Sequence, residues 1–301
     1  MVVTYNRRAM VTRLVSALAA GTVVPAEVVV VDNASTDDTV AALESLRTAG
    51  LPFPLTVHAM TSNTGGAGGF HAGLAAFLER LDADLVWLMD DDGVPDPDCL
   101  ELLLPHVPAY DFVGPAVVSD SDGSRLCFPI RLPGRSAVVH DLADVEAAAR
   151  DGLIEGVVIP FNGVLLTRAL VERIGLVEEK FFIWGDDVEY LWRTKRAGGR
   201  VATVVAARFR HPATDDLGTP MAFGRTTYNH SPSDLKHYCM CRNNTANLKE
   251  YRGPVGVAAF VAKTVWFYLF TRRDLGRLRM SLGAMHDGFY GHWGKHTRYL
   301  R

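Results

Sequence analysis

The sequence predicts an α/β fold, with a mostly parallel sheet flanked by helices and a helical C-terminal region. Over the first 100 residues, short apolar runs alternate with helical patterns, which is typical of strand-helix-strand units. The runs at 28–31 and 85–89 are apolar without interruption, as strands covered by helices on both faces are. At 301 residues, with 48% hydrophobic and 22% charged residues, the chain suits one large domain with an appendage, or two domains.

The expected elements follow one another along the chain. Strands are expected at 2–4, 28–31, 55–58 and 85–89, and helices at 35–47 and 66–81, while Asn6 can cap an earlier helix with an apolar stripe at 11–18. In a less regular middle we expect strands at 126–131 and 161–166, helices at 142–150, 168–174 and 186–197, and a strand from 201 that leads to His211. We expect a first domain at 1–212 and a second at 213–301, with helices at 233–250 and 255–270.

Three consecutive acids, Asp90, Asp91 and Asp92, follow the fourth expected strand. Neighbouring carboxylates repel one another and lose hydration at the end of a core strand, so folding alone gives no reason for them, whereas a divalent cation does. In an extended chain Asp90 and Asp92 point to the same side. The alternative is a polar turn in which one Asp caps the next helix. We interpret the triplet as a metal site at the carboxyl ends of the strands, where ligands of such sheets bind.

A glycine-rich stretch from Asn63 to Gly73 contains five glycines ahead of and inside an expected helix. Glycine lets a backbone approach a ligand closely, and the first N–H groups of a helix can bind phosphate. The stretch lacks the P-loop pattern and, unlike a Rossmann cofactor loop, it follows the third strand. It predicts a nucleotide contact, with a tight packing turn as the alternative.

A second acidic cluster, from Trp184 to Glu189, opens another expected helix. Carboxylates at a helix start gain from the helix dipole, which explains at least one of them. An aromatic ring beside paired acids also suits a sugar site, where the ring stacks on the sugar and a carboxylate takes a hydroxyl proton. His211 ends a core strand, and with Asp90 and Asp92 it would complete a mixed nitrogen and oxygen site suited to Mn²⁺ or Mg²⁺.

Together these segments resemble the family-2 glycosyltransferases, inverting enzymes of the GT-A fold. The resemblance covers about residues 2–211 and rests on V-V-T-Y-N-R, V-V-V-D-N-A-S-T-D, N-T-G-G-A-G-G-F, D-D-D, G-D-D-V-E and R-H-P, in this order. It implies a nucleotide-sugar donor and a metal ion held by Asp90, Asp92 and His211. It also implies a nucleotide-binding set that consists of Thr4, Asn6, Arg7, Asp32, Asn63, Gly65, Gly66, Asp90 and Asp91.

A narrower set of motifs is similar to the galactofuranosyltransferases that initiate arabinogalactan synthesis: W-L-M-D-D-D-G, C-F-P-I-R, F-N-G, Y-C-M-C-R-N and F-T-R-R-D. This resemblance extends to about residue 274 and implies UDP-galactofuranose as donor and a polyprenyl-diphosphate-linked GlcNAc-rhamnose acceptor. Asp187 matches the general base, and Asp186 beside it remains the alternative. Inversion needs no enzyme nucleophile, which agrees with the absence of a catalytic Ser or Cys motif. Acceptor-binding residues are expected at Trp184, Tyr238, Arg242 and Asn243.

The net charge of −3 hides an asymmetry along the chain. From residue 212 onward, 13 Lys and Arg stand against 6 Asp and Glu, whereas the first 211 residues carry 18 against 28. The aromatic segment at 255–270 is shorter than the ~20 residues that span a bilayer, and Arg272 and Arg273 follow it. It predicts a helix in the membrane interface, or alternatively one that packs on the catalytic domain or on another subunit of a homo-oligomer. Scattered cysteines and a start without a signal-peptide pattern predict a cytoplasmic protein, peripheral on the inner face of the cell membrane.

Other functions match the sequence less well. Another family-2 enzyme, such as a rhamnosyltransferase that uses a dTDP-sugar, shares the metal and base residues. A metal-dependent nucleotidyltransferase would normally have a Lys or Arg in the loop between Asn63 and Gly73, and this loop contains neither. A non-enzymatic nucleotide- or glycan-binding module would not need both acidic clusters. The acidic first part and the lack of a known motif argue against nucleic-acid binding.

Overall fold

The computed structural model describes residues 1–80, 82–134, 138–212, 218–223 and 226–300. The chain forms two compact units: the first contains Met1–Val177 and Arg193–Ala213, and the second contains Glu178–Trp192 and Thr214–Arg301. The expected domain boundary at 212 borders residues 213–217, which lie outside the described part of the chain. The expected domain limits therefore stay a prediction.

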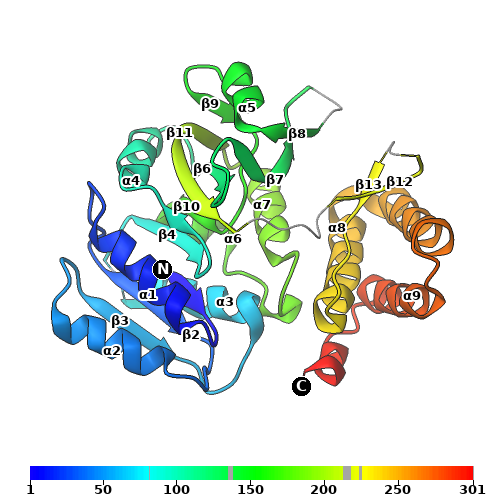
Figure 1. The fold of residues 1–301 in the computed structure, drawn as a ribbon, viewed down its shortest axis with the longest axis horizontal. Coiled ribbons are helices and arrows are strands. Elements are labelled where there is room, and N and C mark those ends of the chain that lie inside the picture. The colour runs from blue at the N-terminus through cyan, green and yellow to red at the C-terminus, as the bar shows by residue number, and fades with distance from the viewer. Residues whose placement is uncertain (81, 135–137, 213–217, 224–225, 301) are drawn as a thin grey trace. The chain divides into compact units, whose positions relative to one another are not determined.

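A mixed sheet forms the centre of the first unit (Figure 1). In the described residues its main path is β3-β2-β1-β4-β10-β6-β11-β5, and β1 to β4 pair in parallel. Past β4 the direction alternates, because β10 pairs antiparallel with both β4 and β6 while β6 and β11 are parallel. The strands are β1 (Val2–Thr4), β2 (Val28–Asp32), β3 (Leu55–Ala59), β4 (Leu85–Asp90), β5 (Val94–Pro95), β6 (Phe112–Ser119), β7 (Arg125–Arg131), β8 (Val138–Asp141), β9 (Leu153–Glu155), β10 (Asn162–Thr167) and β11 (Val201–His211).

Helices cover both faces of the parallel strands. Val2 of β1 packs in one buried cluster with Leu14 of α1 and Leu43 of α2. Val3 points the other way, toward α3, where a Cβ added at Gly69 would lie 2.4 Å from Val3 Cγ1. This alternation follows from the two-residue period of a strand, and all five residues of β2 are buried. The helices of this unit include α1 (Arg8–Ala19), α2 (Thr39–Ala49), α3 (Gly65–Arg80), α4 (Cys99–Leu103), η1 (Leu104–His106), α5 (Leu142–Ala148) and α6 (Arg168–Ile174).

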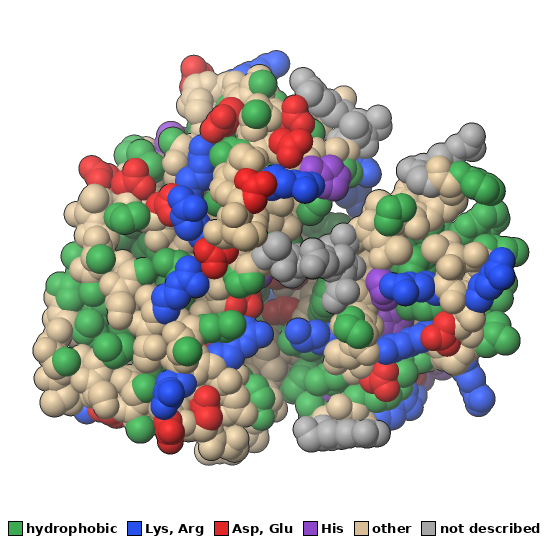
Figure 2. All heavy atoms as spheres, in the orientation of Figure 1, with side chains coloured by type: hydrophobic (Ala, Val, Ile, Leu, Met, Phe, Trp, Pro, Cys, Tyr) green, Lys and Arg blue, Asp and Glu red, His purple; other side chains and the backbone are tan. Residues whose placement is uncertain are grey.

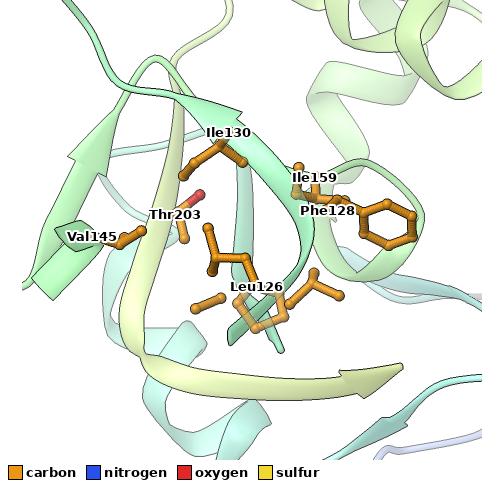
Figure 3. Close-up of a pocket in the computed structure, with 9 residues that line it drawn as sticks. Leu126, Phe128, Ile130, Val145, Ile159 and Thr203 are labelled. Carbon is orange, nitrogen blue, oxygen red and sulfur yellow. The ribbon is translucent and has the colours of Figure 1, made fainter. Parts of the chain in front are cut away.

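A small apolar pocket lies among β6, β7, β11 and α5 (Figure 3). Of its nine lining residues, Thr203 alone has a polar side chain, and its hydroxyl donates to the carbonyl of Val157 at 2.8 Å. No charged residue lines this pocket, so it is part of the apolar interior and offers nothing that would bind a nucleotide.

Helices dominate the second unit. The long helix α8 (Asp234–Trp266) has a kink at Gly253, whose φ is +72°, just before Pro254. The two helices expected at 233–250 and 255–270 correspond to its two parts. A Cβ added at Gly288 of α9 would lie 2.0 Å from the Arg242 carbonyl oxygen, so glycine allows these helices to pack closely. The other elements are η2 (Glu179–Phe181), α7 (Asp186–Arg196), of which the residues up to Trp192 belong to this unit, β12 (Thr219–Met221), β13 (Thr226–Tyr228), η3 (Phe267–Thr271), α9 (Leu275–Tyr290) and η4 (Lys295–Tyr299).

The segment 178–192 falls within the expected first domain but packs with the second unit in the structure. The side-chain amide of Asn243 on α8 donates to three carbonyl groups of this segment. The N···O distances are 2.9 Å to Phe181, 3.0 Å to Ile183 and 2.6 Å to Trp184. Sequence position alone could not reveal these long-range hydrogen bonds.

Candidate active site

Asp92 and His211 lie side by side at one edge of the first unit's sheet. Asp92 Oδ1 is 3.1 Å from His211 Nε2, and the His211 side chain is only 10% exposed. Two neighbouring ligands at ~2.1 Å from an octahedral cation are about 3.0 Å apart, so this spacing matches a shared ion. Asp92 Oδ1 is buried and receives no well-directed hydrogen bond from the described residues. An oxygen left in this state is suited to a metal ion.

The ring of His211 is held from its other side. Nδ1 lies 2.8 Å from the carbonyl oxygen of Pro212 and 3.3 Å from Cys127 Sγ. A carbonyl can only accept, so Nδ1 carries the proton and Nε2 is the atom available to a metal ion. Burial alone would lower the pKa of His211, but Asp92 and Cys127 raise this pKa to about 10. Without a cation, a proton therefore takes the place beside Asp92. The donor set suits Mn²⁺ or Mg²⁺.

Asp90 does not join this pair. In the described residues, the ligand atoms of Asp90, Asp92 and His211 are not all within 4.8 Å of one another. The reason lies in the topology, because β4 ends at Asp90, which pairs with Val3, and the chain then turns away. The next strand, β5, pairs with β11, which brings Asp92 to His211. The expected alternation of side chains along a strand stops at Asp90. The structure therefore brings together two members of the expected set, Asp92 and His211, and the expected metal contact of Asp90 stays a prediction.

Asp91 and Thr4 are buried in one hydrogen-bonded cluster with Arg7. Thr4 Oγ1 donates to Asp91 Oδ2 at 2.7 Å, and Arg7 Nη1 lies 2.9 Å from Asp91 Oδ1 and 2.8 Å from Asp92 Oδ2. Burial raises the pKa of Asp91, while Arg7 and Thr4 oppose this effect. The expectation that Thr4 and Asp91 contact the nucleotide is therefore not supported, because both side chains serve the loop. Arg7 keeps 39% of its side chain exposed, and its expected contact with the diphosphate stays a prediction.

Asn33, which the sequence did not single out as a site residue, organises the glycine-rich loop. Its Oδ1 accepts from the Thr64 backbone N–H at 2.9 Å, and its Nδ2 donates to the Gly65 carbonyl at 2.7 Å. Asn63 Oδ1 in turn accepts from the Gly65 N–H at 2.8 Å. Two of the expected nucleotide-binding residues, Asn63 and Gly65, thus also shape the loop. Gly66 has open space where a Cβ would be, so it is the part of the loop that a ligand can approach.

Asp32 and Asn6 lie at the same edge of the sheet. Asp32 Oδ2 accepts from the Ser35 N–H at 3.0 Å, whereas its buried Oδ1 has no hydrogen-bond partner in the described residues. Asn6 has a left-handed φ of 52°, and its Oδ1 accepts from the N–H of Thr36 at 2.7 Å. Asn6 therefore stabilises the turn that precedes α2. Because of this turn, the helix begins at Thr39 and not at residue 35 as expected.

The second acidic cluster lies at the start of α7 in the second unit. Asp186 is 6% exposed, and burial together with the charge of Asp187 raises its pKa to about 8. Asp187 is half-buried, burial raises its pKa, and its Oδ1 accepts from the Val188 N–H at 2.7 Å. Two carboxyl groups with raised pKa values are suited to proton transfer near neutral pH.

A row of polar side chains on α8 holds this acidic loop. Asn243, Asn247 and Tyr251 recur every four residues, so they share one face of the helix. Asn247 Nδ2 donates to the Gly185 carbonyl at 2.8 Å, and the Tyr251 hydroxyl donates to Glu189 Oε1 at 2.6 Å. The sequence analysis missed Asn247 and Tyr251, although their spacing is visible in the sequence.

Three of the four residues expected to bind the acceptor have structural roles instead. Tyr238, Arg242 and Asn243 are fully buried. The Tyr238 hydroxyl donates to Asp287 at 2.7 Å, and Arg242 Nη2 donates to the Phe181 carbonyl at 2.8 Å. Because these polar groups are buried and hydrogen-bonded within the chain, direct binding of the acceptor by these three residues is not supported. Trp184 is half-exposed, and its role in acceptor binding stays a prediction.

One further group of potential metal ligands occurs in the second unit. Among the described residues, the ligand atoms of His286, Asp287 and His292 all lie within 4.8 Å of one another. Lys295 Nζ is already 2.5 Å from Asp287 Oδ1, so this carboxylate has a cationic partner within the chain. We interpret the group as the ion pair that ties η4 to α9.

Comparison with known proteins identifies the family of this chain. A family model described as glycosyl transferase family 2 matches residues 1–171. Galactofuranosyltransferase GlfT1 of Mycolicibacterium smegmatis is 32% identical over 284 residues, which cover 93% of this chain and 92% of the relative.

Solved structures show the same fold at low sequence identity. Mannosyltransferase PcManGT from Pyrobaculum calidifontis, in complex with GDP-Man and Mn²⁺, superposes with a TM-score of 0.54 at 17% identity, over 97% of this chain and 86% of that one. S. aureus TarS 1-349 in complex with UDP-GlcNAc also gives 0.54, at 16% identity, over 96% and 80% of the two chains. The expected GT-A fold is confirmed. On the family match and the relative together, the chain belongs to glycosyl transferase family 2.

Proposed function

We propose that this glycosyltransferase moves galactofuranose from UDP-galactofuranose to a polyprenyl-diphosphate-linked GlcNAc-rhamnose acceptor, with inversion at the transferred carbon. The observation that carries the proposal is the 3.1 Å contact between Asp92 Oδ1 and His211 Nε2, at the same sheet edge as Asn33, which organises the glycine-rich loop. This edge thus holds both a pair of potential cation ligands and, at Gly66, a backbone with open space that a diphosphate can approach. The identity with the GlfT1 relative supports galactofuranose as the sugar.

Asp92 and His211 are the proposed metal ligands. A bound Mn²⁺ or Mg²⁺ would supply positive charge where negative charge develops on the leaving diphosphate. Arg7 orients Asp92 through its 2.8 Å contact with Asp92 Oδ2, which leaves Asp92 Oδ1 directed at His211. Asp32 Oδ1, buried without a partner, is proposed to accept a hydrogen bond from the nucleoside.

Asp187 is the proposed general base, with Asp186 as the alternative. The carboxylate takes the proton of the acceptor hydroxyl while that oxygen forms a bond to C1 of the sugar. The bond from C1 to the phosphate oxygen breaks, and its electron pair leaves with UDP. Attack from the face opposite the leaving group inverts C1. The raised pKa values of the two acids support this role, because a more basic carboxylate takes up a proton more readily.

The C-terminal unit is proposed to bind the inner face of the cell membrane, where a lipid-linked acceptor would be found. The helical segment Asp234–Thr271 has an apolar window with a mean hydropathy of 1.4, of which 22% is buried. Trp266, Phe270 and Leu275 are 41%, 60% and 70% exposed. Figure 2 shows hydrophobic side chains beside Lys and Arg side chains on the displayed face of this unit. Aromatic and basic groups together favour an anionic membrane interface.

A transfer assay tests the proposed reaction. The protein is incubated with Mn²⁺, a synthetic lipid-linked GlcNAc-rhamnose acceptor and, in separate reactions, UDP-galactofuranose, UDP-galactopyranose or dTDP-rhamnose. Mass spectrometry should show the addition of hexose with UDP-galactofuranose alone, and a chelator should abolish it. A deoxyhexose product with dTDP-rhamnose would instead identify a rhamnosyltransferase.

A further inference from the structure

Unpartnered acceptor atoms gather at one edge of the first unit's sheet. Among the described residues, five buried side-chain polar atoms lack a well-directed hydrogen bond, and three of them are oxygens of Asp32, Asp92 and Asn162. Asp92 Oδ1 has the contact with His211 Nε2 at 3.1 Å, whereas the other two oxygens have no hydrogen-bond partner in the described residues. Asp32 ends β2 and Asp92 follows β4. Asn162 begins β10, which runs antiparallel to β4 and pairs it with Met89, so it lies at the same edge. The proposed function gives Asp32 and Asp92 a ligand but leaves Asn162 without one.

The orientation of the Asn162 amide is fixed. Nδ2 donates to the carbonyl oxygen of Pro160 at 3.0 Å, and a carbonyl can only accept, so the nitrogen must point there. Oδ1 is therefore the atom that is left over, in a side chain that is 93% buried by its relative exposure of 7%. A buried amide oxygen without a donor is costly, so such an atom indicates a partner from outside the chain.

The backbone around Asn162 is held in an unusual conformation. Phe161 has a φ of 59° and Gly163 a φ of 71°, and the strand register shifts between Asn162 and Val164. Hydrogen bonds to β4 fix the residues on both sides of Asn162. The Phe161 carbonyl accepts from the Asp90 N–H at 3.1 Å, and the Gly163 carbonyl accepts from Trp87 Nε1 at 2.8 Å. Left-handed non-glycine residues held in this way are common at ligand sites.

One buried ring places Asn162 beside the loop that carries Asp92. A Cβ added at Gly93 would lie 1.9 Å from the Phe209 ring, and one at Gly163 would lie 2.6 Å from it. Asp92 and Asn162 directly precede these glycines, so the backbones of both residues lie near the same ring. Asn162, whose Oδ1 is unpartnered, therefore lies in the same part of the sheet edge as the loop that carries Asp92.

We infer that Asn162 Oδ1 accepts a hydrogen bond from a hydroxyl group of the transferred sugar and so contributes to the choice of donor. Diphosphate oxygens carry no proton to donate and would repel Oδ1, whereas sugar hydroxyls are donors. A site built to pair with a hydroxyl rejects analogues that lack it, because the buried acceptor is then left unpaired. This inference rests on the proposed function.

Calorimetric titration in the presence of Mn²⁺ tests the inference. For Asn162→Ala, and for Asn162→Ser as a milder change, UDP affinity should stay within about twofold of wild type. UDP-galactofuranose affinity should fall by ~10-fold or more, because the sugar hydroxyl loses its buried acceptor. Asn244→Ala, at a half-exposed asparagine on α8, is the matched control and should change neither affinity. Thermal unfolding verifies that the variants are folded.

Monodeoxy analogues of the donor sharpen the test without relying on a variant alone. Wild type should bind one monodeoxy UDP-galactofuranose at least ~10-fold more weakly than the parent, and Asn162→Ala should bind this pair equally. Equal losses of UDP and UDP-sugar affinity, a loss confined to Mn²⁺ affinity, or wild-type affinities throughout would overturn the inference and leave the transferase in place. A wild-type protein that binds no nucleotide sugar would overturn the proposed function as well.

Discussion

Asp92 Oδ1 lies 3.1 Å from His211 Nε2, although the two residues are far apart in the sequence. The contact exists because β5, just after Asp92, pairs antiparallel with the last residues of β11. One strand pairing therefore assembles the candidate metal site. Substitution of either side chain should therefore weaken metal binding and leave the pairing of β5 with β11 intact.

Asp92→Asn and His211→Ala should therefore weaken Mn²⁺-dependent UDP binding by ~100-fold or more, because each removes one of two protein ligands. Calorimetry with UDP at several Mn²⁺ concentrations measures the effect. Asp120→Asn is a matched control, since the Asp120 carboxylate forms an exposed ion pair with Arg13, with Oδ2 3.4 Å from Arg13 Nη1. Full UDP affinity in both site variants would exclude this pair as the metal site.

Asp187→Asn should lower turnover by ~10²–10⁴-fold while UDP binding stays unchanged, because the amide cannot take up the acceptor proton. Initial rates at saturating donor and acceptor, together with UDP titration, separate the two effects. Asp186→Asn, measured in parallel, identifies the base by the larger loss of turnover. A fall in UDP affinity with unchanged turnover would assign these acids to donor binding.

The raised pKa of Asp186 also predicts how stability depends on pH. Burial and Asp187 raise this pKa from 3.8 to about 8, so the folded state holds a proton that the unfolded chain releases. The contribution to the free energy of unfolding is thus largest below pH 4 and is lost as the pH rises toward 8. Asp186→Asn, which mimics the protonated acid, should be more stable than wild type at pH 8 and about equal at pH 4 in denaturant titrations. A wild-type advantage at pH 8 would contradict this sign.

The sequence predicts well which strands the acids follow, but it predicts less well where their side chains point. The strands that carry Asp32 and Asp90 follow from uninterrupted apolar runs, because such runs need burial on both faces. Asp90 was expected beside Asp92 on the assumption that the strand continues. The structure ends β4 at Asp90, and the later pairing of β5 with β11 decides where Asp92 points. Such a long-range pairing has no local signal.

The misassigned acceptor residues have a related cause. Asn243, Asn247 and Tyr251 share a helix face, which their spacing of four residues reveals. Spacing does not reveal what the face meets, and here it meets the backbone of the acidic loop. A buried polar residue and a ligand-binding residue look alike in one sequence, since both are polar in an apolar context.

The glycines of α3 should separate packing from ligand binding. A Cβ added at Gly69 would lie 2.4 Å from Val3 Cγ1, whereas one at Gly66 meets no atom within 4 Å. Gly69→Ala should therefore lower the free energy of unfolding by ~1–3 kcal/mol through overpacking. Gly66→Ala should leave stability equal or higher by up to ~1 kcal/mol and yet weaken UDP binding. Denaturant titration and calorimetry measure both quantities. Unchanged UDP affinity in folded Gly66→Ala would show that the loop serves packing alone.

Membrane binding should depend on the exposed aromatic residues at the end of α8 and in η3. Trp266 and Phe270 lie with ring centroids 4.7 Å apart, and Arg272 and Arg273 follow them. Burying one such side chain contributes about 1.5–3 kcal/mol, so Phe270→Glu should weaken binding to phosphatidylglycerol vesicles by at least ~10-fold. Vesicle sedimentation measures this, and added salt should weaken the wild-type binding as it screens the arginines.

Met10→Glu is the matched control for the membrane prediction, because Met10 is 43% exposed on α1 in the first unit. Equal losses in both variants, or wild-type binding that is indifferent to lipid charge, would count against a membrane-facing C-terminal unit.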